Sequence, residues 1–193
     1  FLKLDHNTLK KMNILIYADH GKGVGLGHLT RCLSLANDFL KLNNEVLLVI
    51  NKDNNQKLKL DSLKVKLKQI QFSPDEILNL INIFNPDLFI IDSYQFTDDL
   101  VLKLKSNTFV VSFDDFGEQY LPLDLVINSS LGLDKKKYYK FTYSLIGEKY
   151  QIIRHDLLKT KKCNVQKDVK KIIVLTGGDD CNNNTLKLCN FLN

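Results

Sequence analysis

A glycine-rich segment that ends in a histidine is the part of the sequence best suited to chemistry. Residues 19–28 read Asp-His-Gly-Lys-Gly-Val-Gly-Leu-Gly-His, after an apolar run and before residues with helical spacing. The glycines let the backbone approach a ligand closely, and a helix N-terminus offers unpaired N–H groups to an anion. The spacing disfavours NAD, because the dinucleotide fingerprint would need glycine at Leu26 or His28. It also disfavours ATP, because no Gly-Lys-Ser/Thr sequence follows.

His28 lies in the first turn of the expected helix, where the positive end of the helix dipole favours a neutral imidazole. A neutral histidine can accept a proton, and general-base activation of water typically contributes about 10²–10⁴-fold. His28 is therefore the candidate catalytic base, with a simple helix cap as the alternative. Arg31 follows on the adjacent helical surface and could meet a phosphate or carboxylate, with a surface ion pair as the alternative.

Aspartates follow several of the short apolar runs. Asp19, Asp92 and the pair Asp114–Asp115 each end such a run. The carboxyl ends of strands in an open parallel sheet form a ligand crevice, so these carboxylates are predicted to converge there, with Tyr94 on the same rim. Strand-end aspartates also cap helices and form turns, which is the alternative for each of them.

Alternating apolar runs and helical patterns position these residues. The runs are apolar throughout, as expected for parallel strands covered by helices on both faces. The sequence therefore predicts an α/β fold with a Rossmann-like parallel sheet. Expected strands cover 14–18, 45–50, 65–70, 88–91, 109–113 and 125–128, and expected helices cover about 29–40, 74–84 and 97–105.

A second apolar run that leads into glycines and then a helix follows a lysine-rich stretch. An apolar run at 172–175 leads to Thr176-Gly177-Gly178-Asp179 and a short helix. Gly177 and Gly178 would face the first glycine segment across a cleft, with a simple tight turn as the alternative. We predict an N-terminal α/β domain over 12–158, a linker over 159–171 and the start of a truncated C-terminal α/β domain over 172–193.

Composition narrows the class of protein. The chain has 193 residues, 44% of them hydrophobic, and a net charge of +5, but its basic residues are almost all lysine. Nucleic-acid binding is disfavoured because just two arginines, Arg31 and Arg154, are present and no basic run has interleaved aromatics; the lysines at 135–137 are expected to be solvated. The four cysteines lack zinc spacing or a secreted disulfide pattern, which favours a reducing cytoplasm. No run approaches the roughly 20 apolar residues of a membrane span, and residues 1–11 do not resemble a signal peptide.

The motifs, taken in order, resemble those of a known enzyme family. The matching residues are Gly25, Gly27, His28, Arg31, Cys32, Leu33, Leu35 and Ala36, then Asp92-Ser93-Tyr94, Asp114-Asp115, Asp124 to Asn128, Leu145-Ile146-Gly147 with Tyr150 and Arg154, and Thr176 to Asp179. In this order they resemble the UDP-2,4-diacetamido-2,4,6-trideoxy-β-L-altropyranose hydrolases of pseudaminic acid biosynthesis.

That resemblance implies the N-terminal half of a two-domain GT-B glycosyltransferase-like fold. It implies hydrolysis of a UDP-linked sugar at the anomeric carbon, with His28 assisting the water and with no metal or other cofactor. The alternatives are a GT-B transferase that uses a UDP-sugar donor, and a non-catalytic fragment that binds sugar nucleotides. Without a complete C-terminal domain, weak nucleotide binding is expected. The predicted substrate-binding residues are Asp19, Gly25, Gly27, Arg31, Tyr94, Asp115, Arg154, Gly177 and Gly178.

Overall fold

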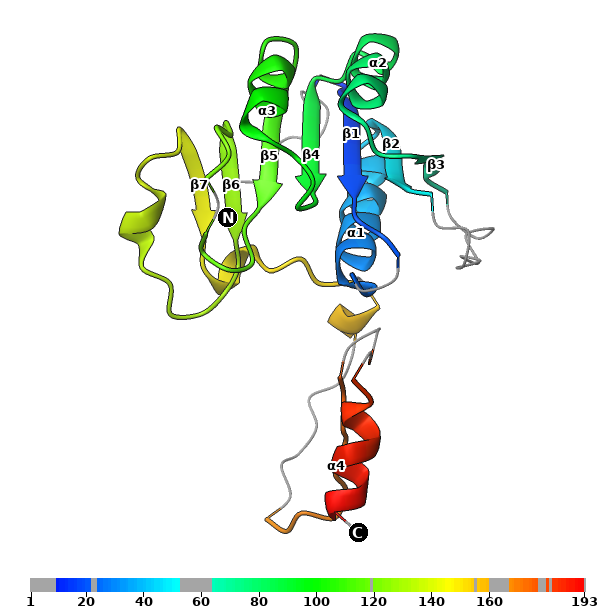
Figure 1. Ribbon diagram of the computed structural model, residues 1–193, viewed down its shortest axis with the longest axis vertical. Coiled ribbons are helices and arrows are strands. Elements are labelled where there is room, and N and C mark those ends of the chain that lie inside the picture. Colours follow the sequence, from blue (N-terminus) through cyan, green and yellow to red (C-terminus); the bar gives the residue numbers. More distant parts are fainter. Residues whose placement is uncertain are drawn as a thin grey trace.

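A seven-stranded, fully parallel sheet forms the centre of the molecule (Figure 1). The strand order is β3-β2-β1-β4-β5-β6-β7, which confirms the predicted Rossmann-like α/β fold. The strands are β1 (Asn13–Ala18), β2 (Glu45–Asn51), β3 (Lys66–Ile70), β4 (Leu88–Asp92), β5 (Phe109–Phe113), β6 (Leu125–Asn128) and β7 (Tyr143–Ile146). The computed structural model describes residues 10–21, 24–52, 64–118, 120–154, 156–159, 167–176, 180 and 182–192.

Helices cover both faces of the sheet, which is why its central strands are apolar on both sides. Helix α1 (Gly27–Lys41) packs on one face through Leu29, Cys32 and Ala36. Helices α2 (Pro74–Phe84) and α3 (Asp98–Lys105) belong to the core of the other face. Along β1 the side chains alternate between these two cores, with Ile14, Ile16 and Ala18 on the α1 side and Leu15 and Tyr17 on the other.

The helix ends follow from local sequence. Ser73 accepts a hydrogen bond from the Glu76 N–H at the start of α2, Pro74 takes the first helical position, and Asn85 ends the helix in a left-handed conformation. Thr97 caps α3 in the same way. Helix α1 differs, because its N-cap residue Leu26 provides no side-chain hydrogen bond. The amide groups of its first turn therefore remain available at the carboxyl edge of the sheet.

Two elements differ from the sequence expectation on the β6 side of the sheet. Strand β7 and the 3₁₀ helix η1 (Lys135–Tyr138) were not predicted; β7 has four residues and lies at the edge of the sheet. Two shorter 3₁₀ turns, η2 (Glu148–Tyr150) and η3 (Leu157–Lys159), follow. The lysines at 135–137 are exposed, as expected for solvated side chains.

The apolar run at 172–175 was expected to form a strand, as the run at 14–18 does, and this expectation is wrong. These residues are in no strand, and Ile172, Ile173 and Leu175 are exposed, because none of the described residues forms a neighbouring strand for them. Helix α4 (Asn184–Leu192) does form, and Figure 1 shows it (red) away from the sheet. The division into domains stays a prediction, and residues 1–9, 160–166, Gly177 and Gly178 lie outside the described residues. Within the part of the chain that is described, no helix is long and apolar enough to cross a membrane.

Candidate active site

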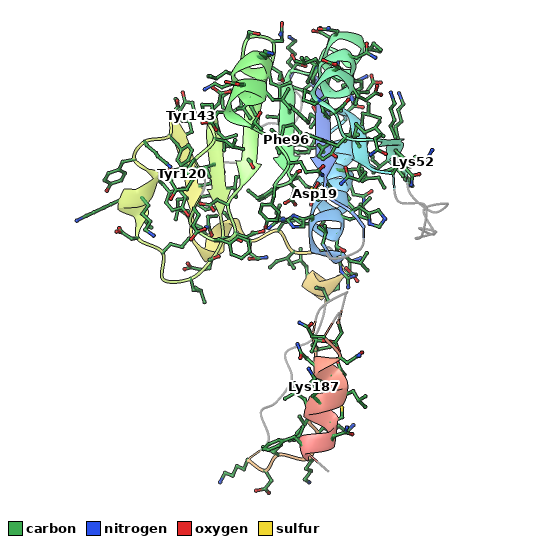
Figure 2. The ribbon with its side chains drawn as sticks, in the orientation of Figure 1. Asp19, Lys52, Phe96, Tyr120, Tyr143 and Lys187 are labelled. Carbon is green, nitrogen blue, oxygen red and sulfur yellow. The ribbon has the colours of Figure 1, made fainter. Side chains whose placement is uncertain are left out.

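The candidate site lies where the strand order reverses, between β1 and β4. The chain moves outward from β1 to β3 and then returns to β4 on the other side of β1. Ala18 pairs with Asp92 at the carboxyl end of this junction, and the Asp19 N–H donates to the Asp92 carbonyl at 2.9 Å. Figure 2 shows Asp19 at this edge of the sheet. Ligands of open α/β sheets bind in the crevice at this point of the topology.

The Asp92 carboxylate organises the site from the end of β4. It is 2% exposed and accepts four hydrogen bonds from α1. Oδ1 receives His28 Nδ1 at 2.5 Å and Arg31 Nη2 at 2.6 Å. Oδ2 receives Arg31 Nε at 2.8 Å and the Cys32 thiol at 3.3 Å. The i, i+3 and i+4 spacing of these donors puts all three on the face of α1 that meets β4.

Arg31 joins Asp92 to a second carboxylate, that of Asp115 after β5. Its Nη1 donates to Asp115 Oδ1 at 2.6 Å and its Nη2 to Oδ2 at 2.9 Å. The guanidinium also lies 4.3 Å from the centre of the Phe113 ring, a cation–π contact that a lysine would match poorly. Arg31 thus fixes α1, β4 and the turn after β5 relative to one another.

These contacts shift the pKa values of Asp92, His28 and Arg31. Burial alone would raise the pKa of Asp92, but the hydrogen bonds from His28 and Arg31 outweigh it, so the pKa lies below its usual value. The hydrogen bond to Asp92 raises the pKa of His28 against the opposing effect of burial. This hydrogen bond opposes the effect of the helix dipole, which on its own would lower the pKa of His28. Arg31 stays charged, since both aspartates offset its burial and raise its pKa.

The ring of His28 is oriented for proton transfer at Nε2. A carboxylate can only accept, so Nδ1 carries a hydrogen, and in the neutral ring Nε2 holds the free electron pair. The ring packs edge-on against Tyr94 at 5.3 Å and lines a cavity of about 500 Å³, here called the site cavity. Its lining includes Leu26, Gly27, Arg31, Asp115, Gln151 and Arg154. The structure thus places five predicted residues, Gly27, His28, Arg31, Asp115 and Arg154, around one cavity.

Asp19 lies at the same carboxyl edge of the sheet, but its carboxylate hydrogen-bonds to residues other than His28, Arg31 and Asp115. Its carboxylate accepts from the Tyr94 N–H at 3.1 Å, from Gln95 Nε2 at 2.7 Å and from Asn51 Nδ2 at 3.4 Å. Asp19 therefore holds the loop after β4 and, through it, the position of Tyr94. The Tyr94 side chain is 62% exposed and also lies near Phe116, with ring centres 6.0 Å apart.

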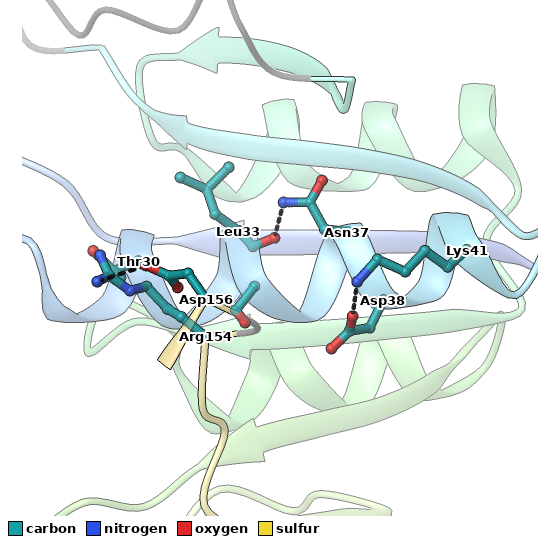
Figure 3. Close-up of a pocket in the computed structure, with 8 residues that line it drawn as sticks. Thr30, Leu33, Asn37, Asp38, Lys41, Arg154 and Asp156 are labelled. Atoms are coloured by element: carbon teal, nitrogen blue, oxygen red, sulfur yellow. Dashed lines mark hydrogen bonds and ion pairs between the residues drawn. The ribbon is translucent and has the colours of Figure 1, made fainter. Parts of the chain in front are cut away.

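Arg154 and Gly27 line the site cavity, and Gly25 lies in the loop just before Gly27. Gly25 has a φ of +75°, and both Gly25 and Gly27 have open space where a Cβ would be, so a ligand can approach the backbone there. Arg154 Nη2 pairs with Asp156 at 3.2 Å. It also lines a second cavity of about 460 Å³ along the outer face of α1, with Thr30, Asn37 and Lys41 (Figure 3).

The same cluster has donor atoms of the kind that bind metals. His28, Asp92 and Asp115 each offer one ligand atom, and these atoms lie within 4.8 Å of one another. Arg31, however, already donates to both oxygens of each carboxylate. Its fixed positive charge occupies the place between the carboxylates, so we assign no metal to this cluster.

Sequence reasoning missed three contacts in the site. The strand-end rule placed Asp92 at the crevice but did not identify it as the partner of His28. It did not predict the contact of Cys32 with Asp92 or the contact of Phe113 with Arg31. The i, i+3, i+4 spacing of His28, Arg31 and Cys32 is the signal that points to one shared acceptor.

Together the fold and the site define a Rossmann-like α/β protein with an Asp–His–Arg cluster at its switch point. No family model matches the chain. An uncharacterized protein of Methanocaldococcus jannaschii is 30% identical over 191 residues, covering 92% of this chain. The chain spans 39% of the length of that relative.

Among solved structures, the chain is similar to an α-glucosyltransferase in complex with UDP and a 13-mer DNA containing an HMU base. The TM-score is 0.42 and the identity 20%, over 70% of this chain and 37% of that chain. It is also similar to the Bordetella bronchiseptica enzyme WbmG in complex with NAD and UDP. There the TM-score is 0.42 and the identity 14%, over 67% of this chain and 58% of that one.

Proposed function

We propose that this chain is the N-terminal part of a hydrolase that releases UDP from a UDP-linked diacetamido-trideoxy sugar, in surface-glycan synthesis of the pseudaminic acid type. One observation carries the proposal: His28 Nδ1 lies 2.5 Å from the buried carboxylate of Asp92, on a ring that lines the site cavity. This is the arrangement of an oriented general base. The ordered motifs of the sequence supply the class of substrate.

In the proposed reaction, water is the nucleophile. Nε2 of His28 takes a proton from the water as its oxygen bonds to the anomeric carbon, and the bond from that carbon to the UDP oxygen breaks. UDP leaves with the electron pair of the broken bond. The resulting imidazolium is stabilised by Asp92, whose carboxylate stays ionised because its own pKa is lowered by its donors.

The arginines have different roles in this proposal. The guanidinium of Arg31 is engaged by Asp92 and Asp115, so it orients the base and its partner rather than holding phosphate. Arg154 is 53% exposed at its side chain and lines the cavity, so it can supply positive charge to the diphosphate. Gly25, Gly27 and the uncapped first turn of α1 offer backbone N–H groups to the same anion.

We propose further that residues 172–193 begin a second α/β domain that completes the nucleotide site. The greater length of the archaeal relative supports this, as does helix α4, which has no buried residue in the described chain. Leu186, Leu188 and Phe191 of this helix are exposed, as expected of a helix that would pack on a further part of such a domain. Titration of UDP against the 193-residue chain tests this part: weak binding is expected, and micromolar affinity would contradict it.

The reaction is tested by phosphorus NMR of UDP release from UDP-linked diacetamido-trideoxy sugars, without any acceptor. The chain is assayed as it stands and, in parallel, extended to its natural C-terminus. We expect release that is lost in His28→Asn and kept in Lys103→Gln, a control at an exposed position on α3. Release that requires an added hydroxyl acceptor would show a transferase instead. Binding of the nucleotide sugar without release would show a binding module.

A further inference from the structure

We infer that Tyr138 is a positioning residue for the candidate site: its hydroxyl holds Asp114, and Asp114 holds the turn that presents Asp115 to Arg31. The consequence for catalysis rests on the proposed function, whereas the geometric link does not. Tyr138 belongs to η1, in the connection between β6 and β7, and so lies outside every motif assigned to the site.

The first step is a buried polar network beside β5 and β6. Tyr138 and Asn128 are each 2% exposed and Asp114 is 6% exposed. Asn128 Nδ2 donates to the Tyr138 hydroxyl at 2.9 Å, and the hydroxyl donates to Asp114 Oδ2 at 2.9 Å. Because the amide can only donate at that nitrogen, the tyrosine proton is directed to Asp114. Burial and then the neighbouring Asp114 raise the pKa of Tyr138 to about 12, so the hydroxyl keeps this proton.

The second step is the turn after β5. The other oxygen of Asp114, Oδ1, accepts the N–H groups of Gly117 at 2.9 Å and Glu118 at 3.1 Å. Gly117 has a φ of +75°, and a Cβ at this position would lie 3.7 Å from the Tyr138 hydroxyl oxygen. One carboxylate thus ties the turn to the β6–β7 connection, 24 residues further along the chain.

The third step concerns the residues that this turn positions, Asp115 and Phe116. Asp115 lies inside the turn and receives Arg31 at 2.6 and 2.9 Å, and Phe116 follows beside Tyr94. The Asp115 side chain is 38% exposed, so packing holds it less than it holds the buried Asp92. Its position therefore depends on the backbone of the turn, and Tyr138 acts on His28 through Asp114, Asp115 and Arg31.

The test compares Tyr138→Phe with Tyr139→Phe, the same change at the next residue, which is 79% exposed. Proton NMR follows the titration of the His28 ring without substrate, and Asp115→Asn provides the reference shift. The groups that face His28 are Asp92 from β4, Tyr94 from the loop after it, Arg31 from α1 and Asp115. Loss of the nearby Asp115 charge lowers the pKa of His28, so Tyr138→Phe is expected to lower it in the same direction.

Three results decide the inference. The amide signals of Gly117 and Glu118 should shift in Tyr138→Phe, and UDP release should fall about tenfold, the loss expected for one hydrogen bond to a charged group. Gly117→Ala keeps the tyrosine but strains the same turn, because alanine disfavours a φ of +75°. This variant should shift the pKa of His28 as well. An unchanged His28 titration in folded Tyr138→Phe would overturn the inference, whatever Gly117→Ala shows. If no variant releases UDP, the proposed function fails, but the titration still tests the positioning role.

Discussion

Replacing Asp92 with asparagine tests the electrostatic basis of the site most directly. The change keeps the shape of the side chain but removes the charge and turns one acceptor oxygen into a donor. That donor then faces Arg31, His28 or the Cys32 thiol, all of which already donate to this position. Breaking a buried ion pair at one partner costs about 3–5 kcal/mol, and the remaining carbonyl oxygen suggests the lower end, about 3 kcal/mol.

For a domain of this size, about 3 kcal/mol corresponds to a melting temperature lower by about 6–12 °C. The pKa of His28 should fall, because Asp92 is the main cause of its elevation. The raised pKa of His28 stabilises the fold fully below pH about 6.5, and this stabilisation is lost as pH rises through the folded-state pKa. The lowered pKa of Asp92 stabilises the fold above pH about 3.8, and this is lost as pH falls through the folded-state value. The difference in unfolding free energy between wild type and Asp92→Asn should therefore be largest between about pH 4 and 6.5.

The assay is urea unfolding followed by circular dichroism at pH 3, 5.5 and 8.5, with Asp98→Asn as a control of equal charge change at an exposed position. The control should cost less than about 0.5 kcal/mol. If Asp92→Asn unfolds at the wild-type urea concentration and leaves the His28 titration unmoved, the carboxylate does not organise the site and the reasoning is refuted.

Three further outcomes follow from single contacts. The rate of UDP release should rise with pH through the raised pKa of His28, and in Asp92→Asn this rise should move to lower pH; a pH-independent rate would exclude His28 as the base. Burial raises the pKa of the Cys32 thiol, so iodoacetamide should label exposed Cys189 in the folded chain and spare Cys32 until denaturant is added, as mapped by mass spectrometry. Ser73→Ala removes the cap of α2 and should lower the unfolding free energy by about 1 kcal/mol in urea melts, whereas an unchanged midpoint would show that the cap is dispensable.

The main body of the fold was predictable because its signals are local and repeated. The run Leu88–Asp92 is apolar and ends in a charge, and Ser73-Pro74 opens a helix whose predicted range, 74–84, is the observed one. Strand β7 escaped prediction because Tyr143–Ile146 is short and depends on the neighbouring β6 for its hydrogen bonds. The converse holds at 172–175, where an apolar run has no described neighbour and remains unpaired.

The site was predictable as a place but not as a set of partners. Strand-end residues and a helix N-terminus indicated where Asp92, Asp115 and His28 would gather. The pairing of His28 with Asp92, and hence the direction of its pKa, depends on side-chain rotamers that spacing does not determine. Asp19 was expected among the ligand-binding groups, yet its carboxylate is engaged by Tyr94, Gln95 and Asn51. The substrate-binding assignments stay predictions.

The position of Arg31 between two aspartates affects the charge that an anion would encounter in the site cavity. Two carboxylates and one guanidinium lie beside the cavity, and the shifted pKa values of Asp92 and Arg31 keep both of these groups charged near neutral pH. Within this cluster, the charge of the His28 imidazole changes as the pH crosses its raised pKa. Binding of a diphosphate should therefore draw a proton onto the ring, so the affinity for nucleotide should weaken as pH rises.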